Sequence, residues 1–364
     1  MPLLYNSALI GARVCASFLL ALLLTTFLPY QTAPRATDAA TLAPTGLWDD
    51  AGNDSVWAEA RRTVPANYPL YRPTLLPGRL RITAQLTDLH LGPLTRMITY
   101  GDPQNGPWLM LTIGVGGGVA DTSTPTVVHG QPGFINTFSN PFDETRVSWA
   151  EAGQWYTVRG SRGTTFEEVL AVANALAPVG ADGRVAPRCF AATPHCVDGA
   201  FLGYWLGHGD LAVNGYPLGD PFQEALADGR TYTVQYFERA RLEAHPEQPE
   251  VRYQILLGQF GRQIVGGVPA APTAPVPAAP DARHFPETGH NVAPDFLAYW
   301  EAHGGLPQFG YPLSEEFTET LEDGQQYTVQ YFERARFEHH PENKAPYDIL
   351  LGQFGRRVLA EAGR

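Results

Sequence analysis

Arginine, glutamate and aromatic residues occur together in one stretch that the chain contains twice. Residues 232–241 read Tyr-Thr-Val-Gln-Tyr-Phe-Glu-Arg-Ala-Arg, and residues 327–336 repeat these ten letters without a change. If the stretch is one strand, alternation puts Phe237, Arg239, Arg241 and Glu243 on one side and Glu238 and Ala240 on the other. Aromatic faces beside guanidinium and carboxylate groups suit a sugar, which needs an apolar platform and planar hydrogen-bond partners. The pattern therefore predicts a carbohydrate-binding face in each copy.

The candidate ligand-binding residues lie at equivalent positions of the two copies. They are Trp205, Tyr216, Phe237, Arg239 and Arg241, and Trp300, Tyr311, Phe332, Arg334 and Arg336. Glu238 and Glu333 have two interpretations. They could form structural ion pairs with nearby arginines, or they could serve a wall-active hydrolase, which needs two carboxylates in distinct environments across a sugar cleft. Because neither a Ser-His-Asp elbow nor a His-Glu-x-x-His motif is present, we expect a non-enzymatic protein without a cofactor.

The cysteines and histidines predict a staple and no metal. Cys189 and Cys196 are closely spaced, and an oxidising compartment would permit a disulfide between them. With His195 they provide only three metal ligands, one short of the usual zinc set. His208 recurs as His303 in the second copy, but a glycine replaces its acidic neighbour Asp210. We therefore expect packing or turn roles for these histidines.

The overall charge argues against nucleic acid as a partner. The formal net charge is −12, and no basic stripe offers the lysines and arginines that phosphates require. The run Gly114-Val-Gly-Gly-Gly118 lacks the following Lys-Ser/Thr of a phosphate-binding loop. A turn between strands is the interpretation that we adopt for it.

Residues 1–36 resemble an export signal or, if uncleaved, a membrane anchor. Arg13 precedes an almost wholly apolar run from Val14 to Leu28, which has the length of a signal core and is short for a membrane span. The Ala/Thr/Pro-rich residues 37–47 read as a linker. The chain is accordingly expected to be extracytoplasmic, either secreted or at the cell surface.

A middle domain is expected over residues 48–179. Short apolar or alternating runs at 80–86, 94–100 and 108–115 suit strands, and residues 146–151 and 155–159 suit a hairpin. Thr165-Phe-Glu-Glu168 has the form of a capping box, and Pro178 is expected to close the helix that follows. The domain should be an antiparallel sheet with a C-terminal helix.

The segments at 68–77, 147–151, 155–158 and 165–178 together resemble an exported bacterial family of unknown function. They are also distantly similar to periplasmic sigma-factor regulators and lipoprotein carriers. The latter resemblance implies a sheet that shelters an apolar ligand or meets a protein partner. The alternative is that Trp149, Trp155 and Tyr156 are core and sheet-face aromatics.

After a linker at 180–188, two small α+β repeat modules are expected: module A (189–265) and module B (284–364). Each should contain an aromatic helix that stops at glycine, a Gly-Tyr-Pro-Leu corner, an Asp-Gly hairpin turn and the decapeptide strand. The Pro/Ala-rich linker at 266–283 should be an extended spacer, and two binding units on such a spacer would raise avidity for a repetitive polymer. The same layout would also serve as a plain stalk.

The modules resemble the LGFP repeat family of bacterial cell-envelope proteins. The resemblance is strongest at Gly304-Gly305-Leu306, residues 309–314 and residues 331–337, and the first copy has Asn214 where the second has Phe309. It implies tethering to the cell wall. We therefore expect an exported, non-enzymatic envelope protein of α+β class whose tandem modules bind cell-wall or surface polysaccharide. The alternatives are a sensor or apolar-ligand carrier anchored by its repeats, and a wall-active hydrolase.

Overall fold

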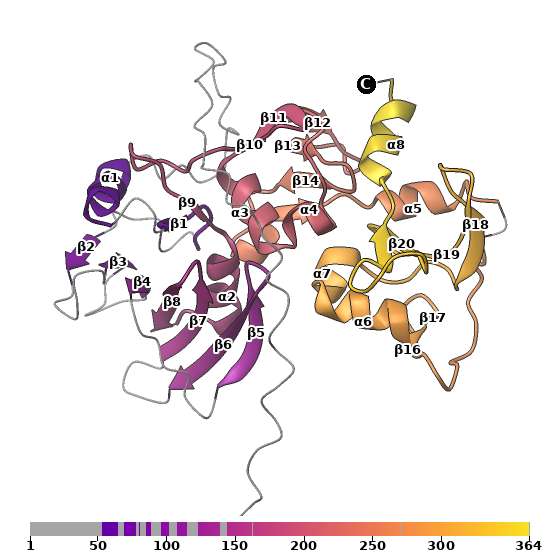
Figure 1. Cartoon of the computed structure of the whole chain (residues 1–364), viewed down its shortest axis with the longest axis horizontal. Coiled ribbons are helices and arrows are strands. Elements are labelled where there is room, and N and C mark those ends of the chain that lie inside the picture. The colour runs from indigo at the N-terminus through magenta and orange to yellow at the C-terminus, as the bar shows by residue number, and fades with distance from the viewer. Residues whose placement is uncertain are drawn as a thin grey trace, which may run out of the picture. The chain divides into compact units, whose positions relative to one another are not determined.

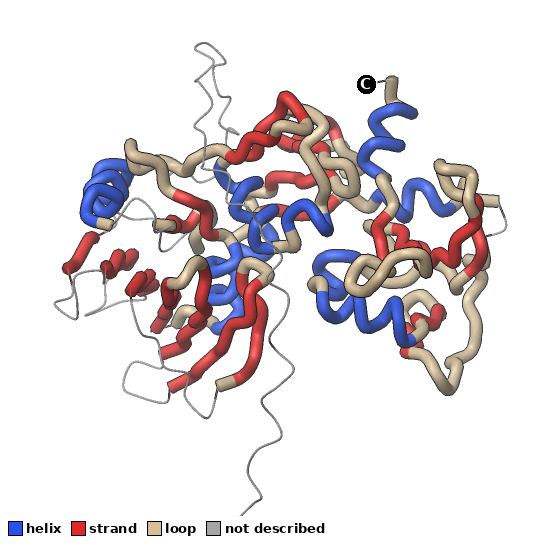
Figure 2. Tube along the Cα trace, in the orientation of Figure 1, coloured by secondary structure: helices blue, strands red, loops and turns tan. Residues whose placement is uncertain are grey.

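The computed structural model describes residues 53–64, 69–77, 80, 85–88, 96–101, 108–114, 123–138, 144–161, 163–269 and 271–363. Helices and antiparallel sheets are mixed along the chain, which is an α+β protein as expected (Figures 1 and 2). The expected signal (1–36), the linker at 37–47 and residues 115–118 of the glycine run lie outside the described residues. Within the described part, no helix is long and apolar enough to cross a bilayer.

The middle domain is built on a seven-stranded antiparallel sheet with the order β2-β3-β4-β8-β7-β6-β5. Its strands are β2 (Gln85–Asp88), β3 (Arg96–Gly101), β4 (Trp108–Gly114), β5 (Thr124–Val128), β6 (Gln131–Phe138), β7 (Glu144–Glu151) and β8 (Gln154–Ser161). The predicted hairpin at 146–159 is confirmed as β7–β8, and its turn places Ala152 and Gly153 at positive φ. Helix α1 (Asp54–Thr63) reaches the sheet through Trp57, whose indole N–H donates to the Tyr100 hydroxyl at 3.1 Å.

The capping box before helix α2 (Phe166–Asn174) is confirmed. The Thr165 hydroxyl accepts from the Glu168 backbone N–H at 3.2 Å, and the Glu168 carboxylate accepts from the Thr165 N–H at 2.9 Å. The helix ends before the predicted Pro178. Residues Leu176–Pro178 instead form β9, since the residue before a proline favours extended backbone. Strand β9 pairs with β1 (Tyr71–Pro73).

Aromatic side chains fill the space beneath helix α2. Trp149 and Tyr156 are fully buried and stack with their ring centroids 5.3 Å apart, and Tyr71 meets Tyr156 edge-on. Helix α2 lies against β7 and β8 and adds Val169 to the same core. The side chains of Trp149 and Tyr156 are therefore core residues, as the alternative interpretation expected.

Modules A and B contain the same helices and strands in the same order, and module A has one additional 3-10 helix, η3. Module A has β10 (Arg188–Phe190), β11 (Thr193–Val197), α3 (Gly199–Gly207), α4 (Asp210–Val213), β12 (Phe222–Ala225), β13 (Thr231–Tyr236), β14 (Arg241–Ala244), η3 (Val251–Tyr253), β15 (Ile255–Leu257) and α5 (Phe260–Val265). Module B has β16 (Arg283–Phe285), β17 (His290–Val292), α6 (Pro294–Ala302), α7 (Gly305–Phe309), β18 (Phe317–Thr320), β19 (Gln326–Tyr331), β20 (Arg336–His339), β21 (Ile349–Leu351) and α8 (Phe354–Glu361). In each module a two-stranded hairpin precedes the helices, and a four-stranded antiparallel sheet follows them.

The decapeptide is not one strand, which corrects the expectation from its sequence. In module A its first half ends β13, residues 237–240 form a tight turn closed by the Phe237 N–H donating to the Ala240 carbonyl at 2.8 Å, and Arg241 begins β14. Module B makes the same reversal between β19 and β20. Since the chain reverses at this point, the expected alternation of side chains from Phe237 to Glu243 does not exist.

Other local predictions for the modules hold. The Asp228-Gly229 turn joins β12 to β13, and the Asp228 carboxylate accepts from the Arg230 N–H at 3.0 Å. Helices α3 and α6 stop just before Gly209 and Gly304, both of which adopt left-handed backbone. Module A shares one hydrophobic core with the middle domain, because α3 packs against β9 and α2.

The proline-rich linker is a strap on module B and not a free spacer. Four hydrogen bonds of 2.8–3.1 Å hold it: Glu315 N to Pro272 O, Val276 N to Gly289 O, Ala279 N to Asn291 Oδ1 and Asn291 Nδ2 to Pro277 O. Modules A and B also contact each other directly through α5 and α8. The expectation of two separate units on an extended spacer is therefore wrong for the described residues, and the avidity argument that rested on it does not apply in that form.

Candidate functional site

Six of the ten candidate ligand-binding side chains are buried in the modules. Phe237, Phe332 and Trp205 have no exposed surface, and Trp300, Arg241 and Arg336 are at most 8% exposed. A polysaccharide on the surface cannot touch these six side chains. Their assignment as a binding face is corrected. The reversal of the decapeptide turns its phenylalanines and the arginines Arg241 and Arg336 inward, and the two tryptophans are buried on helices α3 and α6.

The buried arginines form the centre of an ion cluster in each module. In module B, Arg336 donates to Glu338 at 2.6 and 2.8 Å, to Glu322 at 3.0 Å and to Glu319 at 3.4 Å. Arg241 of module A donates to its own Glu243 at 2.6 and 2.9 Å. Burial opposes the charge of both guanidinium groups, but the surrounding carboxylates prevail and raise the pKa of each arginine. These clusters hold strands together.

Glu238 and Glu333 form the expected ion pairs, and their arginine partners come from the other module. Glu238 accepts from Arg356 of α8 at 2.5 Å, and Glu333 accepts from Arg262 of α5. The second carboxylate oxygen of Glu238 accepts from the backbone N–H of Tyr216 at 3.2 Å. Both glutamates thus have the structural role that was one of their two expected interpretations.

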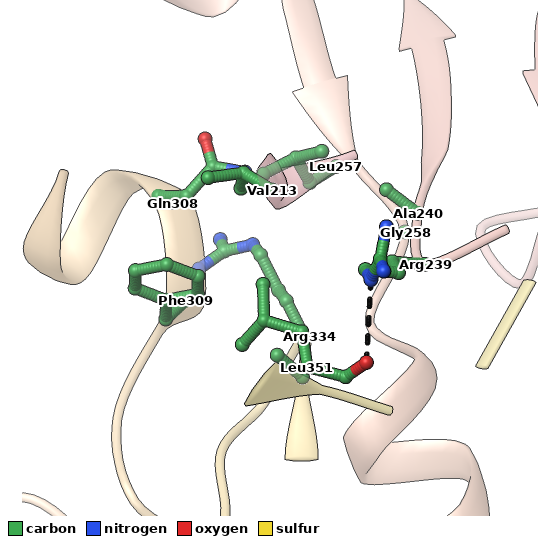
Figure 3. Close-up of a pocket in the computed structure, with 10 residues that line it drawn as sticks. Val213, Arg239, Ala240, Leu257, Gly258, Gln308, Phe309, Arg334 and Leu351 are labelled. Atoms are coloured by element: carbon green, nitrogen blue, oxygen red, sulfur yellow. Dashed lines mark hydrogen bonds between the residues drawn. The ribbon is translucent and has the colours of Figure 1, made fainter. Parts of the chain in front are cut away.

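Arg239 and Arg334 line a small depression between the modules (Figure 3). The Arg239 guanidinium donates to the carbonyl oxygens of Leu211 at 2.9 Å and Leu351 at 3.3 Å, and the second contact crosses to module B. Arg334 donates to the carbonyl of Leu306 at 3.1 Å. Apart from these guanidinium groups the lining is mainly apolar, and the arginines serve mainly to hold α4 and α7 in place.

A half-exposed group of aromatic residues under an arginine remains as the candidate site of module A. Phe190 meets Tyr216 and Trp205 edge-on, with ring centroids 5.3 and 5.5 Å away. The guanidinium carbon of Arg188 lies 4.8 Å from the Trp205 ring centroid and 5.5 Å from that of Phe190. Trp205 is the buried floor, whose indole N–H donates to the Gly215 carbonyl at 3.1 Å. We call Arg188, Phe190 and Tyr216 the platform of module A.

Module B repeats this arrangement at matching positions. The guanidinium carbon of Arg283 lies 4.9 Å from the Phe285 ring centroid, and Tyr311 lies 6.1 Å from Phe285. Trp300 is again the floor and donates to a glycine carbonyl at 3.1 Å. Loss of hydration and the nearby Glu287 carboxylate raise the pKa of Tyr311. We call Arg283, Phe285 and Tyr311 the platform of module B; Phe285 is only 5% exposed, so Arg283 and Tyr311 are its accessible groups.

The platforms include two residues that the sequence predicted, Tyr216 and Tyr311, above two more, Trp205 and Trp300. Sequence reasoning missed the arginine and phenylalanine of each platform. The signal was present as Arg-x-Phe at 188–190 and 283–285, with the same 95-residue spacing as the tryptophans and tyrosines. Neither segment looks distinctive until the strands β10 and β16 bring it over the tryptophan.

The hairpin that carries each platform is closed in a different way in the two modules. Cys189 and Cys196 are directly opposed on β10 and β11 and form a disulfide. In module B the equivalent pair is His284 and Asn291, whose side chains hydrogen bond at 3.1 Å. Among the described residues, no group of three or more histidine, cysteine or acidic side chains is arranged to hold a metal ion. His208 stacks on Tyr204 at 3.8 Å, a packing role.

Comparisons with known proteins give no further guidance on the site. No family model, curated protein or solved structure matches the chain. The interpretation of the platforms therefore rests on their geometry and on their repetition within this chain.

Proposed function

We propose that the protein is an exported, non-enzymatic cell-envelope protein that binds cell-wall or surface polysaccharide through its two platforms. The observation that supports this most directly is the recurrence, in both modules, of an arginine and a partly exposed tyrosine around a phenylalanine and a buried tryptophan. The phenylalanine is partly exposed in module A and buried in module B. The Cys189–Cys196 disulfide supports an extracytoplasmic location for the protein, because disulfides persist in oxidising compartments. The resemblance of the modules to LGFP repeats agrees with the same proposal.

The chemistry of the platform suits a sugar ring. A tyrosine or phenylalanine ring offers an apolar face to the C–H groups of a pyranose, and the phenolic O–H can donate to a ring substituent. An arginine beside the ring supplies planar donors for a hydroxyl, carboxylate or phosphate of the polymer. Because the tryptophan floor fixes the phenylalanine and the arginine, little side-chain freedom would be lost on binding.

Two platforms on one chain suit a polymer that repeats the same unit. The modules touch each other, so the platforms are held at a set spacing and not on a swinging tether. Once one platform has bound a polysaccharide chain, the second platform binds the same chain at high effective concentration, provided that the distance between the platforms matches the repeat of the polymer. This replaces the spacer as the source of avidity in the proposal.

The test is sedimentation of the full chain with purified bacterial cell walls. The variant Tyr216→Ala with Tyr311→Ala should lower the bound fraction, with an apparent affinity reduced at least tenfold. The matched control is Tyr253→Ala with Tyr347→Ala, which removes two other tyrosines that are 42% and 67% exposed on the same modules. The control variant should bind as the parent does.

Two outcomes would count against the proposal. If the parent chain stays in the supernatant at all wall concentrations, the polysaccharide is not its ligand. If the control loses binding and the platform variant keeps it, the ligand sits at the exposed tyrosines instead. Unchanged far-ultraviolet circular dichroism in both variants ensures that the comparison is between folded proteins.

A further inference from the structure

The two modules hold each other by a pair of reciprocal contacts, which we call the latch. The turn at 237–240 of module A receives the start of α8 from module B, and the turn at 332–335 of module B receives the start of α5 from module A. The backbone N–H groups of Gly355 and Arg356 donate to the Glu238 carbonyl at 3.0 and 3.3 Å. In the mirror contact, the Arg262 N–H donates to the Glu333 carbonyl at 3.1 Å.

Glycine is required where each helix meets the turn of the other module. A Cβ atom added at Gly261 would collide with the carbonyl oxygen of Phe332, and one added at Gly355 would collide with that of Phe237. Neither glycine has a positive φ, so the need is for space and not for backbone freedom. The close approach indicates that the helix start and the turn are shaped for each other.

Apolar contact stabilises the latch more than its ion pairs do. One continuous cluster contains Tyr232, Val234, Tyr236, Phe260 and Ile264 of module A and Leu321, Val329, Tyr331 and Phe354 of module B. The Arg262 and Arg356 side chains are 53% and 57% exposed, so water screens their pairs with Glu333 and Glu238. The ion pairs fix the orientation of the two modules relative to each other. The apolar cluster and the glycine contacts allow the helix starts and the turns to pack tightly.

The two halves of the latch are chemically the same. Each module contributes the turn Phe-Glu-Arg-Ala and the helix start Gln-Phe-Gly-Arg, which are identical at 237–240 and 332–335 and at 259–262 and 353–356. A turn therefore cannot distinguish the helix of its own chain from the helix of another copy. Contacts of this isologous kind are those of a two-fold dimer interface.

We propose that the latch is a self-recognition surface through which two copies of this chain exchange modules, module A of each copy pairing with module B of the other. The hinge would be Gly266-Gly267, which is exposed and lies between α5 and the strap. The exchanged dimer makes every contact of the closed monomer twice and requires no new surface.

The linker at 266–283 determines whether the closed monomer or the exchanged dimer is favoured. Because it joins the modules within one chain, their effective concentration for each other is on the order of millimolar. The closed monomer should dominate in dilute protein, and exchange should appear when chains are refolded together at roughly 0.1–1 mM, near that concentration. The dimer closes on itself, so larger species are not expected.

The experiment uses two full-length forms that carry different affinity tags. The two forms are unfolded together in urea and refolded at about 0.5 mM, a concentration chosen to be near the expected millimolar effective concentration. The refolded sample is then diluted and analysed by size exclusion with light scattering. A two-chain species that carries both tags should form, and its share should rise with the refolding concentration. In a chain with Gly261→Leu and Gly355→Leu, that share should fall at least tenfold. The control Gly219→Leu, at a position where an added Cβ atom meets nothing within 4 Å, should keep it.

Three results would overturn the proposal. They are a monomer at every refolding concentration, a dimer that survives the double glycine substitution, and a loss of dimer in the Gly219→Leu control. If the glycine variants do not fold, Arg262→Glu with Arg356→Glu provides a second test, because it opposes like charges across both contacts and leaves the backbone unchanged. A dimer share unaffected by that change would also contradict the latch as the contact.

Discussion

Replacement of Arg336 by methionine should destabilise module B severely. The side chain is 2% exposed and its guanidinium group reaches three carboxylates, the shortest contact being 2.6 Å to Glu338. Methionine fills a similar volume but neutralises none of these groups, and Glu338 remains 7% exposed with its charge. Removal of one partner of a buried ion pair costs about 3–5 kcal/mol, and we expect Arg336→Met to fall in that range.

The pH dependence of the loss tests its cause. Burial opposes the ionisation of Glu322, and the charge of Arg336 favours it. The net result is that the pKa of Glu322 lies below its usual value. Without Arg336 this depression should become smaller, because a backbone hydrogen bond and Arg357 also lower the pKa of Glu322. Since protonation removes the uncompensated charges, the destabilisation should be largest near pH 7 and should shrink as the pH falls below about 4, where ordinary carboxylates protonate.

Urea unfolding observed through Trp300 is the suitable assay. Trp300 is the only tryptophan of module B, so its ¹⁹F resonance in 5-fluorotryptophan protein reports on that module alone. The control Arg357→Met removes an exposed pair with Glu361 at 2.9 Å and should cost no more than about 0.5 kcal/mol. A loss below about 1 kcal/mol for Arg336→Met, or one that does not change with pH, would refute the reasoning.

The remaining predictions concern module A. Burial lowers the pKa of His208 to about 4; the unfolded value is near 6.5, so the neutral side chain contributes stability above about pH 6.5 that is lost as the pH falls toward 4, at most about 3 kcal/mol. Urea unfolding at pH 7 and 4.5 should therefore show a weaker pH dependence in His208→Gln than in the parent or in His303→Gln, and equal slopes would contradict it. Reduction of the Cys189–Cys196 disulfide, which closes a short loop, should lower the free energy of unfolding by about 2–3 kcal/mol, and an unchanged urea midpoint with and without reductant would show that the hairpin does not need it.

Local signals in the sequence were sufficient for much of the fold. The Asp228-Gly229 turn, the Thr165 capping box and the glycine stops of α3 and α6 all depend on residues within a few positions of one another. Such features can be predicted because the same few residues make and satisfy the hydrogen bonds.

The decapeptide could not be predicted in this way. Its amino-acid sequence favours a strand. The reversal after Tyr236 depends on Glu238, which exchanges hydrogen bonds with the backbone of Tyr216, 22 residues earlier. The other module completes the turn with its helix start, more than 100 residues away in sequence. Long-range partners of this kind leave no periodic trace in the segment that they shape.

The candidate site was predicted in kind but only partly in position. The sequence pointed to aromatic and arginine side chains repeated in both copies, and the platforms consist of these types. Arg241 and Arg336 of the decapeptide are internal because carboxylates on their own and on neighbouring strands surround them, as Glu243 of the same strand and Glu224 of β12 do for Arg241. Arg188 and Arg283 became candidates only when the strand pairing placed them over the tryptophans.

The reciprocal form of the latch sets a limit on how many modules can join. Each module has one turn to offer and one helix start to give, and in the pair both are used. A solenoid repeat leaves a free face at each end and can grow by one unit at a time. Here a third module in line would find no vacant turn, so the valence of the array is two. A chain with more copies of this unit would have to add them as further closed pairs.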